Sequence, residues 1–465
     1  MIVGEGPDTD AFFAAYSIYL FFVVFGSTLR VAVVPLLGSV DDERTWRARA
    51  VGVLGRLLGV AAAATVAVVL LSPLLGPLVT PGLPRSARVT ATICLAILAL
   101  ASFCQMGAAS LASALAAARR FPASAALYVG GAAVTLAFGS GLMVAFGVIG
   151  AAIGVLGGSA ALLAGHVVYL RRFAFRVVPT PRAARERESW RLTALAAAGA
   201  AIALSEQLQL TIALAAVSGQ AGAVTAYTYG SFIATLLASV TIYVVGFVML
   251  PGVLATLDAQ GERAALRYLD FAVPVAFYLY LPVAAAYVTF GKPIVEAVLG
   301  SSLNAQSIDL LWDCSRIFLL MNLSLAILAP ASAILLALRR YRAFVVSAAS
   351  IVLLHAVGVI IASSSGPVAV AAVHASLAAA LAIPLLGMGF GWQAAPAVAR
   401  AVRLSLPAAV LALVFPALAL LAPTPSGLVP AAALAAAGLL AYLVIGSVAW
   451  PSVGGRTLRL LIARG

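Results

Sequence analysis

The chain has 465 residues, of which 64% are hydrophobic and only 9% are charged. Soluble domains carry about 25% charged residues, so this composition excludes a water-soluble globule and predicts an all-α, polytopic helical membrane protein. The net charge of +13 requires no nucleic-acid partner. Basic residues gather in the cytoplasmic loops of bacterial membrane proteins, where they also attract anionic membrane lipids.

A helix that crosses the hydrocarbon needs about 20 predominantly apolar residues. The sequence contains thirteen such stretches, which predict about thirteen transmembrane helices. The predicted spans cover 11–37, 50–72, 89–118, 123–145, 147–170, 192–216, 222–254, 269–290, 308–338, 343–363, 367–391, 402–421 and 427–449.

The positive residues alternate between the two sides of these spans. Of the 28 Lys and Arg residues, 23 lie in or beside every second loop and in the C-terminal tail. The opposite loops contain only Arg85, Arg88 and Lys292, while Arg30 and Arg316 lie inside spans. By the positive-inside rule, we expect a bacterial plasma-membrane protein with a cytoplasmic C-terminus and, as given, an extracytoplasmic N-terminus.

Two landmarks repeat along the chain at nearly equal offsets. Pro35 and Pro251 each end a span before a charged loop, and they are 216 residues apart. Arg119 and Arg339 each begin an arginine pair that ends a long span, and they are 220 residues apart. Equal offsets predict an internal repeat, here with both copies in the same orientation. Parallel repeats around a central cavity are a recurrent plan of transporters.

The repeat predicts two pseudo-symmetric lobes of six-helix type and an appended helix pair. The expected domains are an N-terminal lobe at 1–170, a basic cytoplasmic linker at 171–191, a C-terminal lobe at 192–391, and a helix pair with a basic tail at 392–465.

The opening segment from Gly4 to Leu37, with Thr-Asp-Ala-Phe-Phe at 9–13 and Val-Pro at 34–35, resembles the lipid II flippases of the MurJ or MviN family. Further similar segments begin at Gly222, at Lys292 and at Arg316. The resemblance implies the fold of the multidrug/oligosaccharidyl-lipid/polysaccharide exporter superfamily, which has fourteen spans in this family. It also implies one more helix before the 9–13 segment, which accounts for the count of thirteen.

The resemblance further implies cavity arginines that bind the pyrophosphate of the substrate. Phe22 and Val23 stand where the family has an arginine pair, and Phe232 stands at another arginine position. Asp10 and Arg316 match charged positions of the family. The family's role predicts transport of a polyprenyl-pyrophosphate-linked glycan by alternating access, with cell-wall assembly proteins as further partners.

Charges inside a span cost at least ~2.5 kcal/mol each, so every one is a candidate for function. Arg30 lies mid-span, where it is suited either to bind a phosphate or to pair with a buried carboxylate. Glu206 and Gln209 share one helical face, which suits sugar hydroxyls, a monovalent cation or proton, or interhelical hydrogen bonds. Asp313 and Arg316 are three residues apart, so they can neutralise each other. The predicted substrate-binding residues are therefore Asp10, Arg30, Glu206, Gln209 and Arg316.

The sequence shows no phosphate-binding glycine loop, nucleophile elbow or paired catalytic carboxylates in its loops. No cysteines or histidines have metal-ligand spacing. We therefore expect no enzymatic activity, no cofactor and no metal site. Two alternatives to a flippase stay open, namely an ion-coupled exporter of small amphipathic cations and a degenerate paralogue that serves as a scaffold in envelope assembly.

Overall fold

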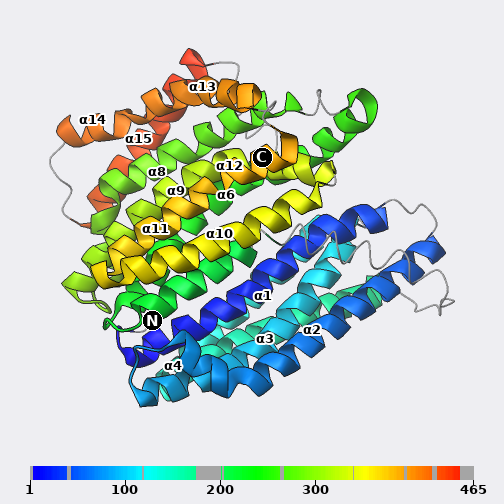
Figure 1. Cartoon of the computed structure of the whole chain (residues 1–465), viewed down its shortest axis with the longest axis vertical. Helices are drawn as coiled ribbons and strands as arrows, with labels where there is room; N and C mark the ends of the chain where they lie inside the picture. Colours follow the sequence, from blue (N-terminus) through cyan, green and yellow to red (C-terminus); the bar gives the residue numbers. More distant parts are fainter. Residues whose placement is uncertain are drawn as a thin grey trace. The chain divides into compact units, whose positions relative to one another are not determined.

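The computed structural model describes residues 4–38, 43–117, 120–173, 201, 204–261, 266–338, 340–391, 395–421 and 427–450. Within these ranges every regular element is a helix (Figure 1). Eleven of the described helical segments are long and apolar enough to cross a membrane, and a shorter apolar helix covers Leu204–Val217. The all-α membrane fold expected from the composition is thus confirmed.

Helix α4, Phe121–Phe173, contains two of the predicted spans. Gly147 interrupts its helical geometry with φ 58° and ψ −142°, a left-handed conformation that favours glycine. The sequence places a span boundary at this glycine. The two legs of α4 and the Leu204–Val217 helix, added to the remaining apolar segments, account for the thirteen predicted spans.

The two legs of α4 pack against each other as an antiparallel hairpin. Gly154 faces Gly139 without room for a methyl group, and Gly158 faces Thr135 equally closely. Small residues let membrane helices approach closely enough for van der Waals contact along their length. Glycine therefore determines how closely the two legs of α4 approach.

The described helices form two compact units. The first contains Val3–Thr225 and Ala348–Ile360, and the second contains Ala226–Ser347 and Ile361–Gly465. The predicted domain boundaries stay predictions, since most of the 171–191 linker lies outside the described residues. Several of the 23 Lys and Arg residues predicted to lie in cytoplasmic loops and the C-terminal tail are also outside the described residues.

The first unit is built around α3. Besides α4 it contains three further full-length helices of the first half, namely α1 (Pro7–Gly38), α2 (Glu43–Val79) and α3 (Arg85–Ala117). Helix α3 packs against α1, α2 and α4. Alanines such as Ala87 and Ala91 are fully buried at these contacts, while Leu70 and Leu136 are more than 70% exposed. Exposed leucines on membrane-spanning helices are suited to contact lipid.

The second unit is built around α8 and α9. Its elements are α6 beyond Thr225 (Ala223–Gln260), α8 (Leu269–Leu299), α9 (Ala305–Ala337), the start of α10 (Tyr341–Ala362), α11 (Pro367–Ala380), α12 (Ala382–Phe390), α13 (Ala395–Ala412), α14 (Val414–Leu421) and α15 (Leu428–Ala449). Helix α8 packs against α9, α13, α14 and α15, and α9 packs against α11 and α12.

Helices α13 and α15 are joined to α8 at two places. At the start of α8, Asp270 forms a two-pronged ion pair with Arg400 of α13, with N–O distances of 2.9 Å. Further along, Tyr278 of α8 packs against Tyr442 of α15 with ring centroids 5.1 Å apart. Gly446 lies directly against the Tyr278 ring, where a larger residue would clash. The helices at the C-terminal end of the chain thus pack on α8.

Candidate functional site

Asp10 lies in the first turn of α1 and is completely buried. Its carboxylate accepts hydrogen bonds from the backbone N–H of Gly222 at 3.1 Å and of Thr225 at 2.9 Å, and from the Thr225 hydroxyl at 2.6 Å. These N–H groups belong to the start of α6, where a helix leaves its first donors unpaired and carries partial positive charge. The carboxylate therefore caps α6 from a different helix.

Neighbouring loops reinforce this end of the first unit. The backbone N–H of Gly82 donates to the Ser218 hydroxyl at 3.0 Å, and Gly82 lies too close to Gly219 for a side chain. The Arg88 guanidinium donates to the carbonyls of Leu83 and Pro81. Arg88 therefore stabilises the 80–84 loop, and this loop packs against the segment that precedes α6.

Glu206 and Gln209 lie on the Leu204–Val217 helix, and the expected shared face is only partly found. Gln209 is fully buried and donates to the Ser205 carbonyl at 3.2 Å, while its side-chain oxygen has no hydrogen-bond partner. Glu206 is half-buried and forms no hydrogen bond or ion pair with any described residue. Thr211 of the same helix bonds to Ser17 of α1 at 3.1 Å. This polar strip therefore borders α1, and its Glu206 and Gln209 oxygens accept no hydrogen bond from the described residues.

Helix α9 carries three charges on one face. Asp309, Asp313 and Arg316 follow at intervals of four and three residues, and Asp309 and Arg316 are exposed while Asp313 is half-buried. Arg316 lies 11 residues into α9, which is about 16 Å along the helix and about half the thickness of the hydrocarbon layer. An arginine at this depth is costly unless water or an anion contacts it.

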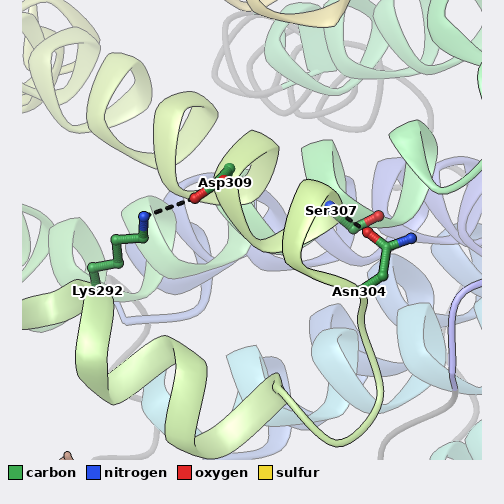
Figure 2. A network of polar contacts seen from close by, with 4 residues as sticks. All are labelled: Lys292, Asn304, Ser307 and Asp309. Carbon is green, nitrogen blue, oxygen red and sulfur yellow. Dashed lines mark hydrogen bonds and ion pairs between the residues drawn. The ribbon is translucent and has the colours of Figure 1, made fainter. Parts of the chain in front are cut away.

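Arg316 also has no internal counterion among the described residues, and in particular it does not pair with Asp313. The expected neutralisation within α9 is therefore not what the structure shows. Asp309, in contrast, is paired with Lys292 of α8 at 2.7 Å, as Figure 2 shows. Arg316 has no such carboxylate partner in the part of the chain that the structure describes.

The α8–α9 connection positions this charged face. Asn304 precedes α9, and its side-chain oxygen accepts a hydrogen bond from the backbone N–H of Ser307 at 2.9 Å (Figure 2). This is the usual arrangement of an N-cap, which fixes where the helix begins. The cap sets the register of α9, so it also sets the depth of Arg316.

Arg30 is part of α1, but its side chain lies outside the described part of the structure. The five predicted site residues are thus distributed over α1, the Leu204–Val217 helix and α9. The substrate-binding role predicted for each of them stays a prediction.

One buried polar pair was not predicted. The Tyr227 hydroxyl of α6 lies 2.9 Å from Nδ1 of His374 on α11. The sequence separates these residues by 147 positions and gives no periodic signal that joins them.

The family model of the lipid II flippase MurJ matches residues 1–424. No functionally curated protein matches the sequence. A solved structure titled lipid II flippase MurJ in an inward closed conformation has a TM-score of 0.73 and 18% identity, and the match covers 96% of this chain and 94% of that one.

More distant structures share the fold. A transporter of the MOP superfamily from Pyrococcus furiosus gives a TM-score of 0.59 at 14% identity, covering 88% of this chain and 89% of that one. An inward-facing multidrug resistance MATE transporter gives 0.61 at 13% identity, covering 86% and 92% respectively. At these identities the structural matches show the fold alone. The family model covers most of the sequence, and the chain therefore belongs to the lipid II flippase MurJ family.

Proposed function

We propose that the protein transports a polyprenyl-diphosphate-linked glycan, lipid II or a related envelope precursor, from one leaflet of the bacterial plasma membrane to the other. The observation that carries this proposal is the match of the flippase family over residues 1–424. The helical membrane fold and the similarity to a MurJ structure support it. The expected step is movement without covalent change, so the protein would act as a transporter and not as an enzyme.

Arg316 is our candidate for the diphosphate site. A guanidinium presents several N–H donors in a planar fork that matches two phosphate oxygens at once. The side chain is exposed, lies at mid-membrane depth along α9, and has no carboxylate partner among the described residues. An anionic headgroup would supply the missing charge. The family's other cavity arginines are replaced at Phe22, Val23 and Phe232, so we expect Arg316 to contribute a large share of headgroup affinity.

Glu206 and Gln209 are suited to bind the glycan of the substrate or a coupling cation, and not its diphosphate. Their side-chain oxygens, which accept no hydrogen bond from the described residues, can accept hydrogen bonds from sugar hydroxyls or coordinate a monovalent cation. Asp10 is fully occupied by the start of α6, so in this conformation its carboxylate has little capacity for a further ligand. We propose that Asp10 supports transport by fixing α6, and that it meets substrate only if this cap opens.

The positive-inside distribution supports a cytoplasmic C-terminus, with pickup of the lipid at the arginine-rich side. The lipid tail would lie outside the headgroup site, in contact with apolar helix faces. Cell-wall assembly proteins are expected partners, since they make and consume such lipids.

Reconstitution into liposomes tests the proposal directly. A labelled polyprenyl-diphosphate glycan is incorporated, and its appearance in the outer leaflet is followed with a membrane-impermeant enzyme or quencher. We expect protein-dependent exchange that is saturable in the labelled lipid. A fluorescent amphipathic cation serves as the comparison substrate. Transport of the cation without transport of the glycan lipid would favour the exporter alternative, and transport of neither would favour the scaffold.

A further inference from the structure

Helix α9 has one open face whose chemical character changes along the helix. The residues of this face follow one another at intervals of four and three, which keeps them on the same side of a helix. Asp309, Arg316 and Leu320 are exposed, Leu320 to 67%, while Asp313 and Leu323 are half-buried. From the start of α9 toward its end, the open face therefore presents carboxylates, then an arginine, then apolar side chains.

The opposite side of α9 is held by hydrogen bonds to two other helices of the second unit. The Tyr280 hydroxyl of α8 donates to the Leu319 carbonyl at 2.7 Å. The side-chain amide of Asn322, a fully buried residue of α9, donates to the Ala234 carbonyl of α6 at 2.8 Å. These contacts fix the rotation of α9 about its own axis, so they also fix the direction of its open face.

The order of groups on the open face matches the order of groups in the lipid of the proposed function. That lipid joins a glycan, a diphosphate and an apolar polyprenyl tail in this sequence. An ionised carboxylate accepts hydrogen bonds, as sugar hydroxyls and amide N–H groups can supply, and a guanidinium binds phosphate oxygens. Asp313 lies three residues before Arg316, about 4.5 Å along the axis, and Leu320 lies four residues after it, about 6 Å. Neighbouring parts of one lipid can therefore reach all three side chains.

Charge determines which diphosphate lipid this face accepts. Lys292 offsets the charge of Asp309 at 2.7 Å, so the negative charge that acts next to Arg316 on the open face is that of Asp313. A glycosylated diphosphate offers sugar donors at this place. A bare polyprenyl diphosphate ends there in a phosphate with a further ionisable oxygen and has no sugar donor. Asp313 would attract the first lipid and repel the second.

We propose that the open face of α9 binds the lipid in one direction and that Asp313 selects glycosylated over bare diphosphate lipids. The glycan would lie beside Asp313, the diphosphate at Arg316, and the first isoprene units beside Leu320 and Leu323. The inference rests on the proposed function and deepens it, because it names a residue that recognises the sugar. Arginines follow α9 at 339–342, so the positive-inside rule supports a glycan directed toward the extracytoplasmic side.

Binding to the purified protein in detergent tests the role of Asp313. Dissociation constants are measured for a short-chain polyprenyl diphosphate that carries one N-acetylated hexosamine and for the same lipid without sugar. We expect the unmodified protein to bind the glycosylated lipid about tenfold more tightly, near the lower end of what a charge-assisted hydrogen bond contributes. Asp313→Ala should bring this ratio to about one. Asp313→Asn should give an intermediate ratio, because a neutral amide accepts a weaker hydrogen bond and does not repel phosphate.

Glu296→Gln is the matched control, since Glu296 is an exposed carboxylate of α8 outside the open face, and it should keep the full ratio. Asp313→Asn carries the test if the alanine variant does not fold. An unmodified protein without preference for the glycosylated lipid would overturn the proposal. So would a full ratio in the Asp313 variants.

Photo-crosslinking tests the direction of the bound lipid. A benzophenone amino acid replaces Leu320 in one protein and Gln306, an exposed residue near the start of α9, in another. After irradiation with the glycosylated lipid, acid cleaves the diphosphate linkage, and mass spectrometry identifies the part that stays on the protein. We expect the tail at position 320 and the glycan at position 306. The reverse pattern would show that the proposed direction is wrong.

These measurements separate the inference from the proposed function. If glycan lipid moves across liposomes but Asp313→Ala keeps the full binding preference, the α9 site is wrong and the transport function stands. If no lipid moves but the preference depends on Asp313, the transport function fails and the binding site stands.

Discussion

Asp10 and Arg316 are both charged and both lie on membrane-spanning helices, yet their surroundings in the structure are opposite. Asp10 is completely buried and accepts three hydrogen bonds from the start of α6. Arg316 is exposed near the middle of α9 and has no partner among the described residues. A charge inside a membrane is costly. Hydrogen bonds within the protein offset this cost for Asp10, whereas water or a ligand must offset it for Arg316.

This difference separates two roles that a sequence pattern cannot distinguish. A charge whose hydrogen bonds are all made within the protein stabilises the fold, and its removal leaves buried donors unpaired. A charge with no internal partner contributes little to folding, and its removal mainly affects what it binds. The comparison predicts that stability and transport respond separately to the two residues.

The largest effect on stability is expected for Asp10→Ala. The N–H groups of Gly222 and Thr225 would lose a charged acceptor while they stay buried, and we expect a loss of about 3 kcal/mol. Thermal unfolding in detergent measures it. Asp8→Ala is the matched control, since Asp8 is exposed and, among the described residues, accepts a single hydrogen bond, from the Thr90 hydroxyl. If Asp10→Ala were as stable as the control, the claim that Asp10 stabilises the fold by capping α6 would be wrong.

Arg316→Gln is expected to reduce lipid transport by tenfold or more while the melting temperature stays the same. One charge-assisted contact to phosphate is worth about 1.5–3 kcal/mol, which corresponds to about one to two orders of magnitude in affinity. Arg316→Lys should restore only part of the activity, because an ammonium cannot bind two oxygens in the planar fork. Arg403→Gln, at an exposed position of α13, is the control for loss of charge alone.

Asn304→Ala should have an intermediate effect on α9. Loss of the bond to the Ser307 N–H removes an N-cap, which typically costs about 1 kcal/mol. If this cap sets the register of α9, transport should fall together with stability. Hydrogen exchange of the first turn of α9 would report the fraying, and unchanged exchange with lost transport would contradict this explanation.

The smallest effect is expected for Lys292→Gln. Its ion pair with Asp309 is solvent-exposed, and exposed pairs contribute little because water screens them (Figure 2). We expect no measurable change in melting temperature. A modest fall in transport would show that unpaired Asp309 competes with the lipid for Arg316, and varying the salt concentration would test that competition.

The sequence was sufficient for the helices but not for their contacts. Continuous apolar stretches and the alternation of arginines predicted the spans, and Gly147 marked the turn inside α4 correctly. Long apolar helices, however, are hydrophobic on the face that contacts lipid as well as on the face that contacts protein. The usual amphipathic signal for helix pairing is therefore weak.

The candidate site shows the same limit. Arg316 could be selected from the sequence because an intramembrane charge is rare, but only the structure shows that no described residue pairs with it. The cap between Asp10 and Thr225 joins residues 215 positions apart, and its only local signal is the Gly-x-x-Thr start of α6. Glu206 and Gln209 were predicted to share a face, but periodicity could not show that Gln209 would be buried and Glu206 only half-buried.

The most direct test of the central claim is the affinity of the purified protein for a short-chain polyprenyl diphosphate compared with the matching monophosphate. We predict that the unmodified protein prefers the diphosphate and that Arg316→Gln binds both equally weakly, with unchanged thermal stability. Retention of the diphosphate preference by Arg316→Gln would contradict the assignment of Arg316 as the headgroup site.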